Sequence, residues 1–139
     1  MKRFLLYLFF FAWVIPLSAQ SDALKAAAQA YRDAMIRDGY RILVQKYGDV
    51  NENRSITSGK LNFQSGKQYA IVFLLDGRAS GKLTLDTGTG RAEIKSHWEY
   101  KNNVTQYLTA FDRVYGQGEI LGSITGLHWY TAHLIVGVK

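Results

Sequence analysis

The sequence Lys-Gln-Tyr-Ala-Ile-Val-Phe-Leu-Leu, residues 67–75, contains the longest apolar run of this 139-residue chain after its N-terminal segment. Ser65-Gly66 before it and Asp76-Gly77 after it are typical of turns, so the run has the length of a strand rather than of a helix. Side chains of a strand alternate between two faces, and here both faces are apolar. The pattern predicts a central strand that is covered on both sides.

The composition limits the class of protein. With 47% hydrophobic and 20% charged residues, the chain has the composition of one globular domain. It has no cysteine, which excludes a disulfide framework, a thiolate metal site and a cysteine nucleophile. The formal net charge is +6, and without Lys2 and Arg3 it is +4, from 15 Lys and Arg against 11 Asp and Glu. The basic residues are spread singly, so we expect no nucleic-acid partner.

The N-terminal segment has the pattern of a secretory signal. Three residues, two of them basic, precede the apolar residues 4–15, and residues 16–20 contain the small residues of a cleavage site. A membrane span needs about 20 apolar residues, so a membrane anchor is the weaker alternative. We expect residues 1–19 to be a signal peptide, with the cut after Ala19 or Gln20. The protein would then be exported, periplasmic or extracellular, with no stable membrane span after cleavage.

Residues 20–39 are predicted to form one amphipathic helix. Ser21 or Asp22 can cap its first turn, and Gly39 fits a C-terminal cap. Apolar side chains at steps of four, three and four make one stripe, which consists of Leu24, Ala28, Tyr31 and Met35. Because a helix of this length is marginal alone, we expect the stripe to dock on the second face of residues 67–75.

Short runs with a period of two, separated by Gly, Asn and Asp, fill the rest of the chain. The clearest is residues 91–100, which predicts one half-buried strand. Its apolar face consists of Ala92, Ile94, Ser96, Trp98 and Tyr100. About eight such strands after one helix predict a mainly β fold, an antiparallel, jelly-roll-like β-sandwich over residues 40–139. A closed barrel is the alternative. The predicted strands are residues 40–47, 60–63, 67–75, 82–86, 91–100, 104–111, 119–125 and 130–138.

Histidines and acidic residues give weak signals for chemistry. His97, His128 and His133 form no zinc motif, and the Gly-Thr-Gly of residues 88–90 lacks the lysine and helix of a phosphate loop. Acidic residues at strand ends could build a calcium site or an acid–base pair, although turn-forming residues explain them better. These acids are Asp76, Asp86, Asp112 and Glu119. We expect no metal, no cofactor and no catalytic residue.

Aromatic residues are the better candidates for ligand contact, because sugars and peptides bind against their flat apolar faces. Trp98 falls on the apolar face of its strand, where core packing is the default. The turn at residues 126–129, Gly-Leu-His-Trp, differs because a tryptophan beside a histidine in a turn would be a contact point if exposed. The candidate ligand-binding residues are His128, Trp129, Tyr130, His97 and Trp98.

Several segments resemble the β-sandwich modules of the bacterial pre-peptidase C-terminal type. They are Gly-Lys-Gln-Tyr at residues 66–69, Asp76-Gly77, residues 82–86 and the terminal Tyr-x-Ala-x-Leu-x-Val strand. The chain also resembles small exported bacterial proteins of unknown function that place a helix before such a sandwich. The acidic Asp-x-Asp of many members is replaced by Ala-Ser-Gly-Lys at residues 79–82, so the resemblance does not extend to a calcium site. It implies a non-catalytic accessory or binding module outside the cytoplasm.

The sequence leaves three functions open. The first is an exported, non-enzymatic β-sandwich that binds a polymer or a protein in the envelope or outside the cell, with a glycan or a protein as the expected partner. The second is a small hydrolase that uses His97 or His133 with a nearby carboxylate in a cleft. The third is a structural envelope component that pairs with a partner through a long uncovered edge strand.

Overall fold

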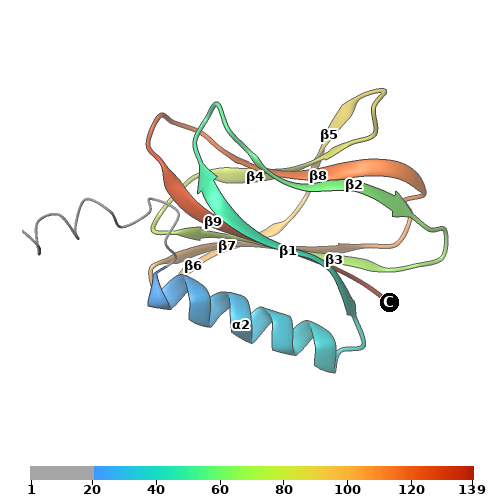
Figure 1. Ribbon diagram of the computed structural model, residues 1–139, viewed down its shortest axis with the longest axis horizontal. Coiled ribbons are helices and arrows are strands. Elements are labelled where there is room, and N and C mark those ends of the chain that lie inside the picture. Colours follow the sequence, from blue (N-terminus) through green and yellow to red (C-terminus); the bar gives the residue numbers. More distant parts are fainter. Residues whose placement is uncertain (1–20) are drawn as a thin grey trace, which may run out of the picture.

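The structure is a computed structural model and describes residues 21–139. The predicted signal peptide lies outside the described residues. In Figure 1, two antiparallel sheets lie face to face and one helix covers the outer face of one sheet. This confirms the mainly β fold with one helix before it, and the two separate sheets make it a sandwich rather than a closed barrel. The elements are α2 (Asp22–Arg37), β1 (Arg41–Val50), β2 (Ile56–Phe63), β3 (Tyr69–Asp76), β4 (Gly81–Asp86), β5 (Arg91–Ile94), β6 (His97–Lys101), β7 (Val104–Phe111), β8 (Gly116–Ile124) and β9 (Tyr130–Val138).

Strand β3 is the centre of the five-stranded sheet, whose order is β1-β9-β3-β7-β6. Ile71, Phe73 and Leu75 belong to the core between the two sheets, and Val72 and Leu74 belong to a second core beneath the helix. All five side chains are buried. Burial of each is favourable by about 1.5–3 kcal/mol, which explains why this strand needs a cover on both faces.

The opposite sheet has the order β2-β8-β4-β5. On β8 of this sheet, a Cβ on Gly122 would lie 2.6 Å from Cε1 of Phe73 on β3. A glycine at this position therefore lets the two sheets pack without a gap.

Helix α2 begins at an N-cap, because the hydroxyl of Ser21 accepts a hydrogen bond of 3.1 Å from the backbone N–H of Leu24. It ends before Gly39, whose φ of 93° lets the chain reverse. In the predicted stripe, Leu24, Ala28 and Met35 are buried and Tyr31 is half-buried. They pack against Val72 and Leu74, so the helix covers the outer face of β3. Among residues 21–139, no helix has the length and hydropathy to cross a bilayer.

The prediction of one strand over residues 91–100 is wrong. Strand β5 pairs with β4 in one sheet, whereas β6 pairs with β7 in the other. The alternation continues through Lys95 and Ser96 without Gly or Pro, so the pattern gives no sign that the chain changes sheets there. The predicted apolar face is confirmed only in part: Ile94, Ser96 and Tyr100 are half-buried, whereas Ala92 and Trp98 are exposed, Trp98 to 49%, because both segments are edge strands. Three other strands are longer than predicted: β1 ends at Val50, β2 begins at Ile56 and β8 begins at Gly116.

Candidate functional site

One end of the sandwich carries the connections at residues 51–55, 77–80, 102–103 and 125–129, and we call it the loop end (left in Figure 1). Three of the five candidate residues lie here. His128 and Trp129 are exposed in the β8–β9 loop, and Tyr130 is half-buried as the first residue of β9.

The β8–β9 loop exposes two large apolar side chains. Leu127 is 70% exposed and Trp129 is 51% exposed, with the exposed His128 between them. Burial of such side chains is worth about 1.5–3 kcal/mol each. Their joint exposure on one loop makes the loop a candidate contact surface.

The same loop is held at both ends. The N–H of Thr125 donates to the carbonyl of Ser80 at 3.0 Å, and the N–H of Glu52 donates to the carbonyl of Gly126 at 2.9 Å. At the other end of the loop, Tyr130 packs on the inter-sheet core, and its ring lies 3.9 Å from the Cβ position of Gly77. Trp129 is therefore presented on a loop whose flanking residues are fixed.

The β3–β4 connection places a cation at the loop end. The guanidinium of Arg78 lies 4.6 Å from the centroid of the Tyr100 ring, which is worth about 0.5–1 kcal/mol at an exposed site. The hydroxyl of Thr105 donates to the carbonyl of Gly77 at 2.6 Å and accepts from the N–H of Ala79 at 3.1 Å. These bonds fix the backbone on both sides of Arg78.

His97 and Trp98 lie elsewhere, on edge strand β6. They pair with Leu108 and Tyr107 of β7 and, as neighbours in a strand, point to opposite faces. Strands β3 and β7 separate β6 from β9. The structure therefore does not bring His97 and Trp98 together with the three candidates of the loop end. Within the described residues, the side chain of His97 forms no hydrogen bond or ion pair.

His133 is only 5% exposed, on strand β9. Its Nε2 lies 3.1 Å from Nε2 of Gln45, and its ring stacks on Tyr47 with centroids 6.2 Å apart. Burial lowers the pKa of this imidazole, which favours the neutral form. The neighbour at Nε2 is thus the side-chain amide of Gln45.

The outer face of the four-stranded sheet carries a row of charges that strand register brings together. Each of the four strands contributes one residue. The two cations stand at the ends of the row and the two anions between them, in the order Lys60, Glu119, Asp86 and Arg91. Of the strand-end acids noted in the sequence, Asp86 and Glu119 are therefore direct neighbours. Sequence reasoning missed Lys60 and Arg91 because only the register shows that they flank the acids.

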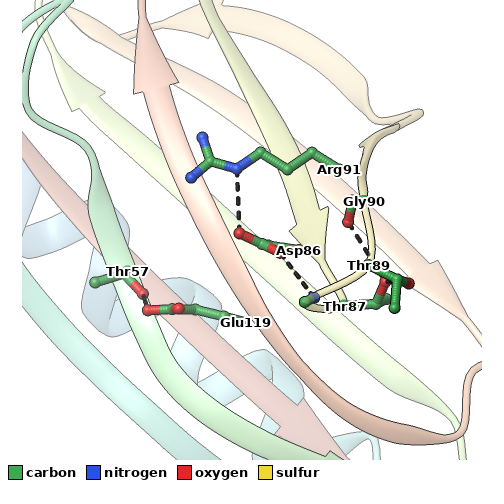
Figure 2. Close-up of polar contacts among 8 residues, drawn as sticks. Thr57, Asp86, Thr87, Thr89, Gly90, Arg91 and Glu119 are labelled. Carbon is green, nitrogen blue, oxygen red and sulfur yellow. Dashed lines mark hydrogen bonds and ion pairs between the residues drawn. The ribbon is translucent and has the colours of Figure 1, made fainter.

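Figure 2 shows how the two carboxylates of this row are bound. Asp86 accepts hydrogen bonds from the N–H of Gly88 at 2.9 Å and from Nε of Arg91 at 3.1 Å, and Glu119 accepts from the hydroxyl of Thr57. The Gly88 amide, and then Arg91, lower the pKa of Asp86. An acid that must deliver a proton needs a raised pKa, so the row has the features of a charge-compensated surface. In the part of the chain described here, no three His, Cys, Asp or Glu side chains are placed to hold a metal ion.

An open groove of about 580 Å³ lies between the C-terminal half of α2 and strands β3 and β7. Small side chains make its floor, because Ala70 pairs with Ala110 and Ala34 faces them from the helix. Beside it, the hydroxyl of Tyr31 donates to Oε1 of Gln106. The pairing of the two strand alanines depends on register, so nothing in the sequence pointed to this groove.

Comparisons with known proteins leave the family open. No protein-family model and no curated protein matches the chain. Among solved structures, the chain is similar to the infectious bursal disease virus VP2 subviral particle, with a TM-score of 0.35 and 13% identity over 73% of this chain. It is also similar to structures of the Gt and Gx strains of that virus, with TM-scores of 0.31 and 0.29, identities of 10% and 12%, and coverage of 73% and 70%.

The matched region spans 31–33% of those viral chains. TM-scores of this size carry no argument, so the fold rests on the observed strand pairing. The resemblance to pre-peptidase C-terminal-type modules is supported by no family match and stays a prediction.

Proposed function

We propose that this chain is an exported, non-enzymatic module that binds a glycan at the loop end. The observation that carries the proposal is Trp129, whose side chain is 51% exposed on a loop fixed at both ends. An aromatic ring offers a sugar a flat apolar face. Because the loop is already ordered, binding loses less conformational entropy.

The surroundings of Trp129 favour a glycan over a protein partner. A stable protein interface buries about 800 Å² on each partner around an apolar centre, whereas Leu127 and Trp129 are the large exposed apolar side chains of this loop. The neighbouring β1–β2 turn contacts the loop through Glu52 and exposes the polar side chains of Asn53 and Arg54. A small apolar platform beside hydrogen-bonding groups is the usual composition of a site for a small polar ligand.

Export is proposed from the N-terminal pattern of a charged start, an apolar run and small residues. The hydrolase alternative gains no support from the histidines. The side chain of His97 forms no hydrogen bond or ion pair among the described residues, and His133 is buried with the amide of Gln45 at its Nε2.

A glycan array probed with three purified proteins tests the proposal: the wild type, Trp129→Ala and Trp98→Ala. Trp98 is the matched control, because it is a tryptophan of similar exposure, 49%, on a different element. We expect the wild type and Trp98→Ala to retain the same glycans, and Trp129→Ala to lose them by about tenfold or more, the loss typical of a central contact residue. An array without bound glycan, or equal retention by Trp129→Ala, would contradict the proposal.

A further inference from the structure

Four strands form the sheet edges of the described residues: β1, β2, β5 and β6. Unpaired backbone groups on an edge strand can pair with another chain, and most edges carry features that prevent it. Strands β5 and β6 have only four and five residues, and β2 has a register shift between Thr57 and Lys60. Strand β1 has ten residues, and its shift between Ile42 and Val44 leaves residues 44–50 regular.

We propose that residues 44–50 of β1 pair antiparallel with the same residues of a second copy of this chain, about a two-fold axis through Tyr47. The two five-stranded sheets would become one continuous sheet across an isologous interface. A groove of about 430 Å³, lined by residues 45–49 of β1 and 54–57 beside it, runs along this edge and leaves it open. The proposal does not use the loop end and is independent of the proposed function.

The outer face of β1 is complementary to itself in this register. Gln45, Tyr47 and Asp49 share that face, since they pair with alternate residues of β9. With the axis at Tyr47, each Tyr47 meets its own copy and each Gln45 meets Asp49 of the second copy. Aromatic pairs and polar pairs directly opposite each other stabilise antiparallel strands. Tyr47 is 57% exposed in the single chain, so its ring is available for this contact.

Charge supports the same register. The guanidinium of Arg32, on α2, donates to Oε1 of Gln45 and has no ion-pair partner within the described residues. The carboxylate of Asp49 accepts a hydrogen bond of 3.3 Å from Thr131 and likewise has no ion-pair partner there. Pairing Gln45 with Asp49 brings each unpaired carboxylate to the side chain that already binds the guanidinium.

The inner face of β1 favours this axis over one at Lys46. Lys46 is an inward-pointing charge, a feature that protects edge strands. With the axis at Tyr47, Lys46 lies opposite Gly48 of the second copy. Gly48 has no side chain, and no atom of the single chain lies within 4 Å of the position that its Cβ would take, so the lysine has room. An axis at Lys46 would place two lysines directly opposite each other, which is destabilising. If the two copies of β1 were shifted by one residue relative to each other, outer-face residues of one copy would lie opposite inner-face residues of the other.

The chain has no cysteine, so single cysteines give an unambiguous cross-linking test on the full chain. Tyr47→Cys should form a disulfide-linked dimer on mild oxidation, because paired residues place their Cβ atoms about 4.5–5.5 Å apart. Gln45→Cys and Asp49→Cys should each form no disulfide-linked dimer alone and should form a disulfide-linked heterodimer when mixed. The absence of that heterodimer, or equal cross-linking of all three single variants, would overturn the register.

Sedimentation equilibrium tests the dimer without cysteines. We expect the wild type to dimerise reversibly and Asp49→Arg to weaken dimerisation by at least tenfold. The new arginine would lie opposite Gln45 of the second copy, beside the guanidinium of Arg32, and the two cations would repel each other. Glu93→Arg is the matched control: it makes the same charge change on β5, at the edge of the other sheet, and should dimerise like the wild type. A wild type that is monomeric at every concentration, or an unaffected Asp49→Arg, would overturn the proposal.

Discussion

Replacement of Gly122 by alanine tests how closely the two sheets pack. A Cβ at this position would lie 2.6–2.8 Å from three atoms of the Phe73 ring. That ring is fully buried and lies against Tyr107, with centroids 5.9 Å apart, so any shift of the ring must displace neighbouring side chains. Overpacking of this kind costs about 1–3 kcal/mol. Alanine also lowers the conformational entropy of the unfolded chain, which offsets about 0.4–1 kcal/mol of that cost. We expect a net loss of about 1.3 kcal/mol in the free energy of unfolding, the difference between the middles of these two ranges.

Urea denaturation followed by far-UV circular dichroism measures this loss. Gly137→Ala is the matched control: its new Cβ meets the flexible methyl end of Met35 at 2.7 Å and lies 3.2 Å from Cβ of Tyr40 and 3.4 Å from the carbonyl oxygen of Arg41, so it should cost less than Gly122→Ala. Phe73→Leu should partly rescue Gly122→Ala, with a coupling of at least about 0.5 kcal/mol in a double-mutant cycle. If Gly122→Ala were as stable as the wild type, or strictly additive with Phe73→Leu, the close packing of the sheets would be refuted.

Three further predictions concern the helix, the buried histidine and the N-terminus. Leu24→Ala should lower the free energy of unfolding by about 2–5 kcal/mol, and Lys25→Ala on the exposed face by less than about 0.5 kcal/mol, both measured by urea denaturation; equal losses would show that the helix does not pack on β3. Because burial lowers the pKa of His133 in the folded state, the unfolded state binds more protons below about pH 6.5, and stability should fall as the pH drops from there. His133→Gln should flatten that dependence, and an unchanged slope between pH 7 and pH 5 would contradict this cause. Mass spectrometry of the exported protein should find Gln20 or Ser21 at the N-terminus, and a chain that still begins at residue 1 would exclude the cleaved signal.

Patterns local in sequence predicted the central layers of the fold. The doubly apolar residues 67–75 indicated a strand covered on both sides, and β3 is buried on both faces. The stripe of the helix has a period that only one face of a helix can satisfy, and its buried members Leu24 and Met35 pack beneath that strand. In both cases, the burial of apolar side chains is encoded in the spacing of neighbouring residues.

Features that depend on long-range pairing could not be predicted. Residues 91–100 alternate without interruption, yet the chain leaves one sheet and joins the other, because the free edges of β4 and β7 take up its two halves. The same alternation assigned Trp98 to a core face, although its position on an edge strand leaves it half exposed. The charge row around Asp86 requires the register of four strands, which no single segment specifies.

The candidate site was partly accessible from sequence, because turn chemistry is local. Gly126, with φ of 110°, marks the turn that carries Trp129 into solvent. The backbone bonds that fix this turn come from Glu52 and Ser80, which are distant in sequence. Ligand binding by Trp129 remains a prediction.

The most direct test of the glycan site is the fluorescence of Trp129 itself. In a chain of residues 21–139 that carries Trp98→Phe, Trp129 is the single tryptophan. Titration with a glycan retained on the array should shift its emission to shorter wavelength, with saturation, as the ring leaves water. If this emission stays constant while the matched Trp129→Phe chain, which retains Trp98, shows the saturable shift, the ligand binds at β6 and the loop-end account is contradicted.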